Sequence, residues 1–503
     1  MADLARLVLR LAAGLGLAAA AGMAAADTLR VVIPNPPIGR GNPYQASGPA
    51  NAYVAPAIFD ALTVIDRDGE VQPGLALSWQ SDASGRTWTF WLRPGVTFSN
   101  GAPFDADSVV AALNYMTGKP QPADLVLLEF SDVAGFRALD PLTVEVVGRG
   151  PIPLLPRAAS VLFVVEPETW RRLGPQEFAA APVGTGPFKV DRWGAAGIAL
   201  SAASQSWRRP NVDGLEFLFQ LEATARLQSL LAGRSDIVFG VGVEDRAALD
   251  SVGATLVFAS IPQVTTLMLL AAKPGSPFAD VRVRQAVNYA VDKTRLVDAF
   301  FGGQLPTAGQ PAARTAIGYN PELAPYPYDP ARAKALLREA GRENGFTFAI
   351  DAAVGSSGPD GAIYQQIAQD LAAVGITMDI RAMPGIRFGQ VFRAGSWEGD
   401  AFAFHYTAVP TFDALRSLKY YQCASEPAVY CDPGSTPLLD QAEQAPTLSA
   451  RADIARRVMA RYHEQAAALF LFETPGFHAV GQRVRGFRMD NMRIAFEEIE
   501  LAR

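Results

Sequence analysis

The sequence predicts an α/β protein built from more than one lobe, each containing a mixed sheet. The chain has 503 residues, of which 49% are hydrophobic. At roughly 100–200 residues per domain, this length corresponds to two to four domains with cores of their own. Helical periodicity alternates with strand-like runs along the later half of the chain, which is typical of α/β lobes. No internal repeat or long linker separates these blocks, so we expect the domains to interleave.

The balance of acidic and basic residues indicates which classes of molecule the protein can bind. The chain carries 44 Lys and Arg against 50 Asp and Glu, a formal net charge of −6 at pH 7. No cluster of basic residues stands out, and a nucleic-acid partner is therefore not expected. The chain has 2 cysteines, too few to staple a protein of this length, so the hydrophobic core must supply the stability.

Residues 1–26 are typical of a secretory signal peptide. Arg6 and Arg10 supply the positive charge, and the uncharged run Leu11–Ala26 ends in small residues before a cut preceding Asp27. A membrane anchor is the alternative, but this run is rich in Ala and Gly and shorter than the roughly 20 apolar residues that span a bilayer. No Cys lies near the cut, which excludes a thioether-linked lipid. We therefore expect an unanchored protein in the periplasm of a bacterium with two membranes.

Export changes how the two cysteines are interpreted. Cys423 and Cys431 lie close together in a stretch that contains Pro427 and Pro433. In an oxidising compartment the spacing predicts a short-range disulfide. A metal site is the alternative, but two sulfurs without a neighbouring histidine make poor zinc spacing.

The first half of the chain contains clear strand and helix signals. Thr28–Ile33 is an apolar run of strand type, and residues 87–93 alternate, which predicts a strand with one buried face. Asp105 precedes a helical apolar stripe and is expected to cap that helix.

The later half repeats helix followed by strand. Asp before the first turn and Gly after the last are the usual start and stop signals of a helix. The predicted elements are a helix over 222–232, a strand over 236–239, a helix from Asp280 through Val291, a helix from Asp329-Pro330 to Gly341, a helix over 361–374 and a strand over 376–380.

Catalytic and cofactor motifs are absent from the sequence. The 3 histidines, His405, His463 and His478, include no pair at i, i+4, and no G-x-S-x-G motif occurs. Gly184–Pro187 looks faintly like a phosphate loop, but Pro removes an N–H donor and no Gly-Lys-Ser/Thr follows, so it reads as a structural turn. We expect no enzyme activity, no cofactor and no metal. A secreted hydrolase stays open as the alternative, because acid pairs are too common to exclude a glycosidase.

Four blocks in order resemble the extracytoplasmic solute-binding proteins of ABC importers, in the peptide/nickel/opine branch that includes dipeptide- and oligopeptide-binding proteins. The blocks are 74–79 with 85–98 and 100–109, then 182–190 with Trp193, then 278–286, and then 326–337. Together they cover most of the mature chain, and their joint match is far more specific than any single turn.

The resemblance implies a two-lobe fold of the periplasmic-binding-protein class II type with an inserted extra domain. It also implies a receptor that carries a peptide or other small solute to an ABC permease, and we expect a monomer. The implied division is lobe I over 27–53, 184–262 and 478–503, the inserted domain II over 54–183, and lobe III over 263–477.

The resemblance also implies where the ligand binds. One wall of the cleft is a loop after Asn42-Pro43, in which Ser47 and Gly48 match a family contact. The other wall follows the strand 400–404. There His405, Tyr406 and Thr407 fall where the family places an aromatic residue against the ligand, and Tyr406 matches that residue.

Two departures from the family pattern bear on the solute. Dipeptide binders hold the ammonium group with an Asp where this chain has Ala408-Val409-Pro410, and the carboxylate with an Arg where it has Gly355–Gly358. Losing a buried charge partner costs about 2–5 kcal/mol, so a zwitterionic dipeptide would bind weakly. A longer peptide held by its backbone, or a more apolar solute, fits better. An opine, a nickel complex held by His405 and an oligosaccharide remain open.

Overall fold

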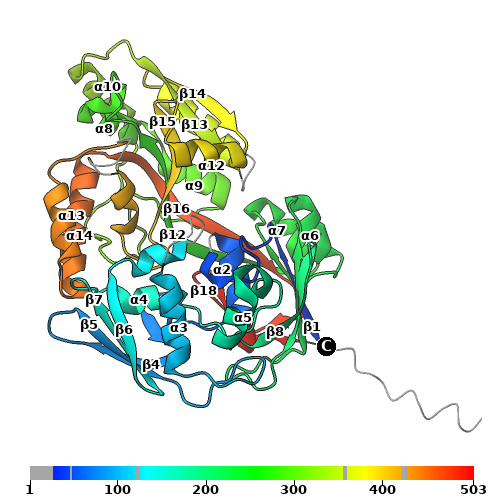
Figure 1. Ribbon diagram of the computed structural model, residues 1–503. Helices are drawn as coiled ribbons and strands as arrows, with labels where there is room; N and C mark the ends of the chain where they lie inside the picture. The colour runs from blue at the N-terminus through cyan, green and yellow to red at the C-terminus, as the bar shows by residue number, and fades with distance from the viewer. Residues whose placement is uncertain are drawn as a thin grey trace, which may run out of the picture.

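The computed structural model describes residues 27–45, 48–118, 125–354, 359–421, 423 and 429–502 (Figure 1). The predicted signal peptide, Ser47 and Gly355–Gly358 lie outside these residues. In the described part of the chain, no helix is long and apolar enough to cross a membrane.

A ten-stranded mixed sheet runs through the whole molecule. In order across the sheet, its strands are β14 (Ile376–Met383), β13 (Phe346–Ala353), β15 (Ala401–Thr407), β12 (Thr255–Leu269), β16 (Ala468–Val480), β11 (Ile237–Phe239), β1 (Thr28–Ile33), β10 (Gly214–Phe219), β9 (Gly197–Ala202) and β8 (Phe188–Trp193). We call the end with β1 and β8–β11 lobe I and the end with β13–β15 lobe III, after the division that the resemblance implies.

The long strands β12 and β16 pair with each other and connect the two lobes (Figure 1). Their antiparallel ladder pairs Ser260 with Pro475 and resumes at Val264 with Glu473, after an irregularity that contains Pro262. Proline cannot donate a ladder hydrogen bond. The pairing between the strands is therefore interrupted at the level where one lobe passes into the other.

The inserted segment packs onto lobe I as one body. Its four-stranded antiparallel sheet has the order β4-β5-β7-β6. One hydrophobic core contains Val31 and Phe217 from lobe I together with Phe90 and Val109 from the inserted segment. Because this core is continuous, we treat lobe I and the inserted segment as a single body.

The elements of that body are α2 (Pro49–Ile58), β2 (Thr63–Ile65), β3 (Val71–Pro73), β4 (Ala76–Ser81), β5 (Thr87–Leu92), α3 (Ala106–Met116), β6 (Val133–Asp140), β7 (Thr143–Gly148), α4 (Leu155–Ala158), α5 (Pro167–Phe178), α6 (Ala223–Leu231) and α7 (Arg246–Ser251), besides the lobe I strands. Gly184 and Gly186 sit against the last turn of α2, where a Cβ on Gly186 would lie 2.5 Å from the carbonyl carbon of Ile58. The Gly184–Pro187 turn is therefore a packing feature.

Lobe III has a core on each face of its sheet. Leu267 and Leu269 of β12 belong to one core, and Val264 and Met268 belong to the other, as the alternation of a strand requires. The helices on the first face are α8 (Val281–Ala290), α9 (Lys293–Phe301), α10 (Pro330–Glu339) and α11 (Asp360–Ala372). Those on the second face are α12 (Gly385–Ala394), α13 (Thr436–Glu443) and α14 (Leu448–Glu464).

The local signals are confirmed at several helix starts. Asp105 accepts a hydrogen bond from the backbone N–H of Ser108 at 2.9 Å, and Asp329 accepts one from Arg332 at 2.9 Å. Asp280 caps α8 in the same way. The predicted strand Thr28–Ile33 is β1.

Candidate functional site

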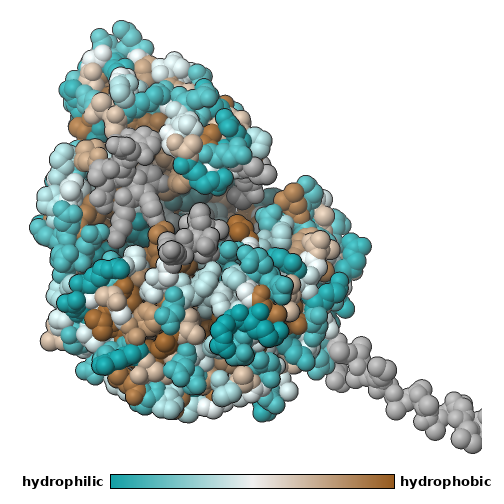
Figure 2. All heavy atoms as spheres, viewed as in Figure 1, coloured by the Kyte–Doolittle hydropathy of each residue, from teal (hydrophilic) through white to brown (hydrophobic). Residues whose placement is uncertain are grey.

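The surface is hollowed between the two bodies. Figure 2 shows a recess between lobe III and the body that contains α2. The strands β12 and β16 connect the bodies at this level, where their pairing is interrupted. A ligand in this recess would touch both bodies. The candidate site consists of side chains of β12, β15 and β16 that lie beside the interruption.

Three polar side chains from three neighbouring strands form a triangle beside the interruption. Thr265 Oγ1 of β12 lies 3.2 Å from Nδ1 of His405 on β15 and 3.1 Å from Oγ1 of Thr474 on β16. Thr474 Oγ1 lies 3.3 Å from the same Nδ1 atom. Strand pairing places Thr265 directly opposite His405, so the backbone of the sheet fixes this geometry.

Two further side chains extend the triangle along the strands. Gln263 pairs with Thr407, and its Nε2 donates to Thr407 Oγ1 at 3.1 Å. Thr407 Oγ1 also accepts a hydrogen bond from the backbone N–H of Val409 at 3.2 Å. We call Gln263, Thr265, His405, Thr407 and Thr474 the polar strip.

The polar strip meets solvent, whereas the residues between its members do not. Gln263 and Thr265 are half-buried, and Val264 and Thr266 beside them are fully buried. Glu473, next to Thr474, is buried and accepts a hydrogen bond from the backbone N–H of Arg314 at 2.9 Å. Because Glu473 pairs with Val264, it belongs to the opposite face of the sheet.

His405 is neutral in this setting. Its side chain is exposed, yet desolvation by the surrounding protein lowers its pKa to about 4. Within the described residues, no charged side chain forms an ion pair with it. At ordinary pH the ring is therefore an uncharged imidazole.

Tyr406 does not belong to the strip. Its side chain is 1% exposed and packs against Phe404 and Phe470, with ring centroids 5.4 and 6.2 Å away. The expected strand ended at Phe404, but β15 continues to Thr407. Alternation along this longer strand therefore turns Tyr406 into the core of lobe III, away from His405. A contact between Tyr406 and the ligand stays a prediction that this arrangement does not support.

On the lobe I side, Gly48 precedes α2 with φ 77° and ψ 173°, and its Cα faces open space. This backbone conformation is essentially restricted to glycine. Its loop is anchored by Tyr44, which stacks on Tyr115 at 4.7 Å and packs edge-on against Trp170 at 5.2 Å. The predicted Ser47 lies outside the described residues.

The helix behind Gly48 packs onto β16. Tyr53 of α2 contacts the ring of Phe239 at 4.1 Å and the ring of His478 at 6.2 Å. His478 follows Thr474 by four residues, about 13 Å along a strand. The lobe I loop and the polar strip thus both contact β16, the strip at its irregular region and the loop through α2 and His478 farther along the strand.

His478 is buried, and neither of its ring nitrogens has a hydrogen-bond partner among the residues that the structure describes. It is 3% exposed, and burial is the main cause that lowers its pKa to about 3. The ring packs against Phe239 with centroids 4.3 Å apart. It is a core residue of the connecting strand.

Contacts also cross between the bodies away from the connecting strands. Arg416, in the turn of 3-10 helix η6 (Arg416–Tyr421), forms an ion pair with Glu129 of η2 (Leu125–Phe130) at 2.8 Å. Buried Arg157 of α4 donates from Nε to the carbonyl oxygen of Thr411 in lobe III at 2.6 Å. The structure therefore has the two bodies in contact.

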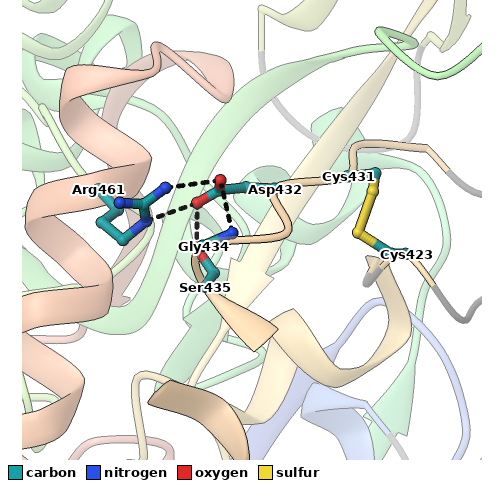
Figure 3. Close-up of a disulfide and its surroundings, with 6 residues drawn as sticks. All are labelled: Cys423, Cys431, Asp432, Gly434, Ser435 and Arg461. Atoms are coloured by element: carbon teal, nitrogen blue, oxygen red, sulfur yellow. Dashed lines mark hydrogen bonds and ion pairs between the residues drawn. A yellow bond between two sulfur atoms is a disulfide. The ribbon is translucent and has the colours of Figure 1, made fainter. Parts of the chain in front are cut away.

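The cysteines lie at the edge of lobe III. Cys423 and Cys431 form a disulfide, shown in Figure 3. The next residue, Asp432, accepts two hydrogen bonds from Arg461 of α14, each 2.7 Å long, and further hydrogen bonds from Gly434 and Ser435. The disulfide and this carboxylate together hold the segment after the loop against α14.

The described residues hold no group of three or more His, Cys, Asp or Glu side chains that could bind a metal ion. In the part of the chain that the structure describes, His405 has hydroxyl partners and no carboxylate partner. The arrangement is suited to hydrogen bonding.

The family model of the bacterial extracellular solute-binding proteins, family 5 middle, matches residues 70–423 of the chain. The chain belongs to this family. Among its relatives, the glutathione-binding protein GsiB of Salmonella paratyphi A is 29% identical over 373 residues, which cover 72% of this chain and 71% of GsiB.

Solved structures of the periplasmic-binding-protein type share the fold of this family 5 protein. HbpA2 from Haemophilus parasuis superposes with a TM-score of 0.80 at 24% identity, covering 94% of this chain and 100% of HbpA2. The periplasmic binding protein DppA from Helicobacter pylori, in complex with the peptide STSA, gives a TM-score of 0.77 at 21% identity and covers 95% and 98% of the two chains. The predicted α/β periplasmic-binding-protein fold is thereby confirmed.

Sequence reasoning missed three members of the polar strip, Gln263, Thr265 and Thr474. Thr265 and Thr474 are separated by 209 residues, so their contact exists only after the sheet has formed. The signal that could have found them is local: polar residues at alternate positions of an apolar strand, each set next to a proline.

Proposed function

We propose that this family 5 protein is the periplasmic receptor of an ABC importer, binding a peptide or peptide-like solute between its lobes and delivering it unaltered to the membrane permease. The observation that carries the proposal is the polar strip, an uncharged hydrogen-bonding surface placed where two bodies meet at an interruption in their connecting strands. GsiB is a glutathione-binding protein and DppA was solved with the peptide STSA, and these two ligands support a peptide-like solute.

The proposed mechanism is a shift between open and closed populations. A solute that touches lobe I and lobe III together binds the closed form better, and its differential affinity stabilises that form. The permease then recognises the closed form. The chain itself performs no chemistry, and it acts as a monomer.

The choice of solute follows from the charges of the strip. None of its five members carries a formal charge at neutral pH, since His405 is neutral. Hydroxyl, amide and imidazole groups match the backbone amides of a peptide longer than two residues better than a pair of terminal charges.

Small-angle X-ray scattering with and without a defined library of unmodified tetrapeptides tests this function. We expect a smaller radius of gyration with the library and no cleavage of its members by mass spectrometry. An unchanged scattering profile would contradict the receptor mechanism, and cleaved peptides would favour the secreted hydrolase.

A further inference from the structure

The hydrogen bonds among Thr265, His405 and Thr474 limit which ring nitrogen of His405 can carry the hydrogen. Each hydroxyl has one proton to donate, and Nδ1 of a neutral imidazole either accepts or donates. If Nδ1 accepts, one hydroxyl donates to Nδ1 and the other donates within the triangle, so every proton is used. If Nδ1 donates instead, one hydroxyl proton has no acceptor among the three groups.

The first arrangement places the ring hydrogen of His405 on Nε2. No acceptor for Nε2 lies within hydrogen-bond distance in the described residues, and the side chain is exposed. In this arrangement the contact of Thr265 with Nδ1 holds the ring, and Nε2–H is a donor with a fixed direction.

The donor is also uncharged. The surrounding side chains on the same face, Gln263 on β12, Thr407 on β15 and Thr474 on β16, are neutral, and Glu473 lies on the opposite face with Arg314 beside it. The low pKa of His405 agrees with this setting, because a nearby carboxylate would raise it. A neutral donor suits a neutral acceptor, whereas a carboxylate is better bound by Arg or Lys.

We propose that Nε2–H of His405 donates a hydrogen bond to an uncharged carbonyl oxygen of the solute, an internal amide carbonyl of a peptide, with Thr265 and Thr474 as positioning residues. This inference rests on the proposed function and deepens it. His405 then recognises the peptide backbone. Solute affinity therefore depends on an internal amide of the peptide and little on its terminal carboxylate.

The first test separates the two ring nitrogens by substitution. The amide of Gln at this position reaches as far as Nε2, and the shorter amide of Asn reaches only as far as Nδ1. The probes are the tightest-binding member of a tetrapeptide library and its C-terminal amide, with affinities measured by titration calorimetry. We expect acid and amide to bind the wild type within about threefold of each other, and His405→Gln to bind within about threefold of the wild type. His405→Asn should lose about tenfold or more for both probes.

The second test reads the tautomer directly. The chain has 3 histidines, so long-range proton–nitrogen correlation spectra of protein labelled with ¹⁵N-histidine can be assigned with single substitutions. We expect hydrogen on Nε2 and none on Nδ1 in His405. Thr265→Val combined with Thr474→Val should remove this preference and weaken binding, and the matched Thr→Ser variants should restore both.

The outcomes of these tests distinguish failure of this inference from failure of the proposed receptor function. If the wild type retains no library member, the proposed function fails and the inference fails with it. If the wild type binds but His405→Asn binds equally well, or the spectra place hydrogen on Nδ1, the receptor function survives and the inference is overturned. Binding of the free acid but not of its amide would also overturn the inference.

Discussion

Arg416 of lobe III and Glu129 of the inserted segment form an ion pair that joins two bodies with different cores. The guanidinium Nη2 lies 2.8 Å from Glu129 Oε1, and the two side chains are 21% and 11% exposed. Arg157 makes a second contact between the same two bodies through the carbonyl oxygen of Thr411. Both contacts lie away from the connecting strands β12 and β16, so they can form only while the bodies are together.

Glu129→Gln is therefore expected to favour the open form. Losing a half-buried ion pair at such an interface should cost about 1–2 kcal/mol, which corresponds to about a 5- to 30-fold loss of solute affinity. Titration calorimetry with a bound tetrapeptide checks the affinity, and scattering checks the radius of gyration, which should rise.

Glu168→Gln is the matched control, because its ion pair with Arg171 is exposed and lies within one helix. It should change neither quantity. Charge exchange, Glu129→Arg with Arg416→Glu, should recover part of the affinity. If Glu129→Gln binds like the wild type and scatters like it, the contact does not stabilise the closed form.

His478 is expected to make folding stability depend on pH. Its pKa in the folded state is about 3, below the ordinary value of 6.5, so the unfolded chain binds the proton more readily. Stability is therefore full above pH 6.5 and falls as the pH drops from 6.5 towards 3. Each pH unit in this window costs about 1.4 kcal/mol, or about 3 kcal/mol at pH 4.5.

His478→Phe removes this contribution while keeping an aromatic ring against Phe239 and Tyr53. Urea unfolding at pH 7 and pH 4.5 should show a smaller loss of stability in the variant than in the wild type. His405 is present in both proteins, so it cancels in the comparison. Equal losses in the two proteins would show that His478 is not buried in its neutral form.

Gly48→Ala should weaken solute binding. At φ 77° and ψ 173° a Cβ strains the backbone by about 1–3 kcal/mol, even though space is available, and the strain should displace the loop before α2. We expect about a 5- to 10-fold loss of affinity for the tetrapeptide probe.

Gly174→Ala provides the control, since Gly174 in α5 has φ 72° and ψ 169° and also faces open space. It should lose similar stability in urea unfolding and keep its affinity. If the two variants bind the probe equally well, the loop at Gly48 does not form a wall of the site.

The disulfide between Cys423 and Cys431 should stabilise lobe III against denaturant. The two cysteines are separated by 8 positions, and closing so short a loop is worth about 2–3 kcal/mol in the unfolded chain. Cys423→Ser with Cys431→Ser should lower the urea midpoint by a corresponding amount. Reductant should lower the midpoint of the wild type equally and leave that of the double variant unchanged. If reductant leaves the urea midpoint of the wild type unchanged, the disulfide does not contribute this stability.

Local features of the fold could be predicted from the sequence because their causes are local. Asp105, Asp280 and Asp329 cap their helices through backbone groups two or three residues away, so sequence and structure agree there. The alternation in residues 87–93 correctly predicted β5, with Phe90 and Leu92 buried.

The candidate site could be predicted only in part, because its geometry depends on pairing over long distances. The resemblance pointed to His405, but pairing with β12 extends β15 through Thr407 and thereby turns Tyr406 away. The contact of Thr265 with Thr474 depends on the pairing of β12 and β16, which brings together residues 209 positions apart. No local pattern contains that information.

The central claim is that the chain binds a solute between its lobes and releases it unchanged. The most direct measurement is mass spectrometry of what the purified protein retains from a defined tetrapeptide library after desalting and denaturation. The account predicts about one molar equivalent of intact peptide per chain for a single-site receptor. Retention of no peptide, or recovery of fragments in place of intact peptide, would contradict it.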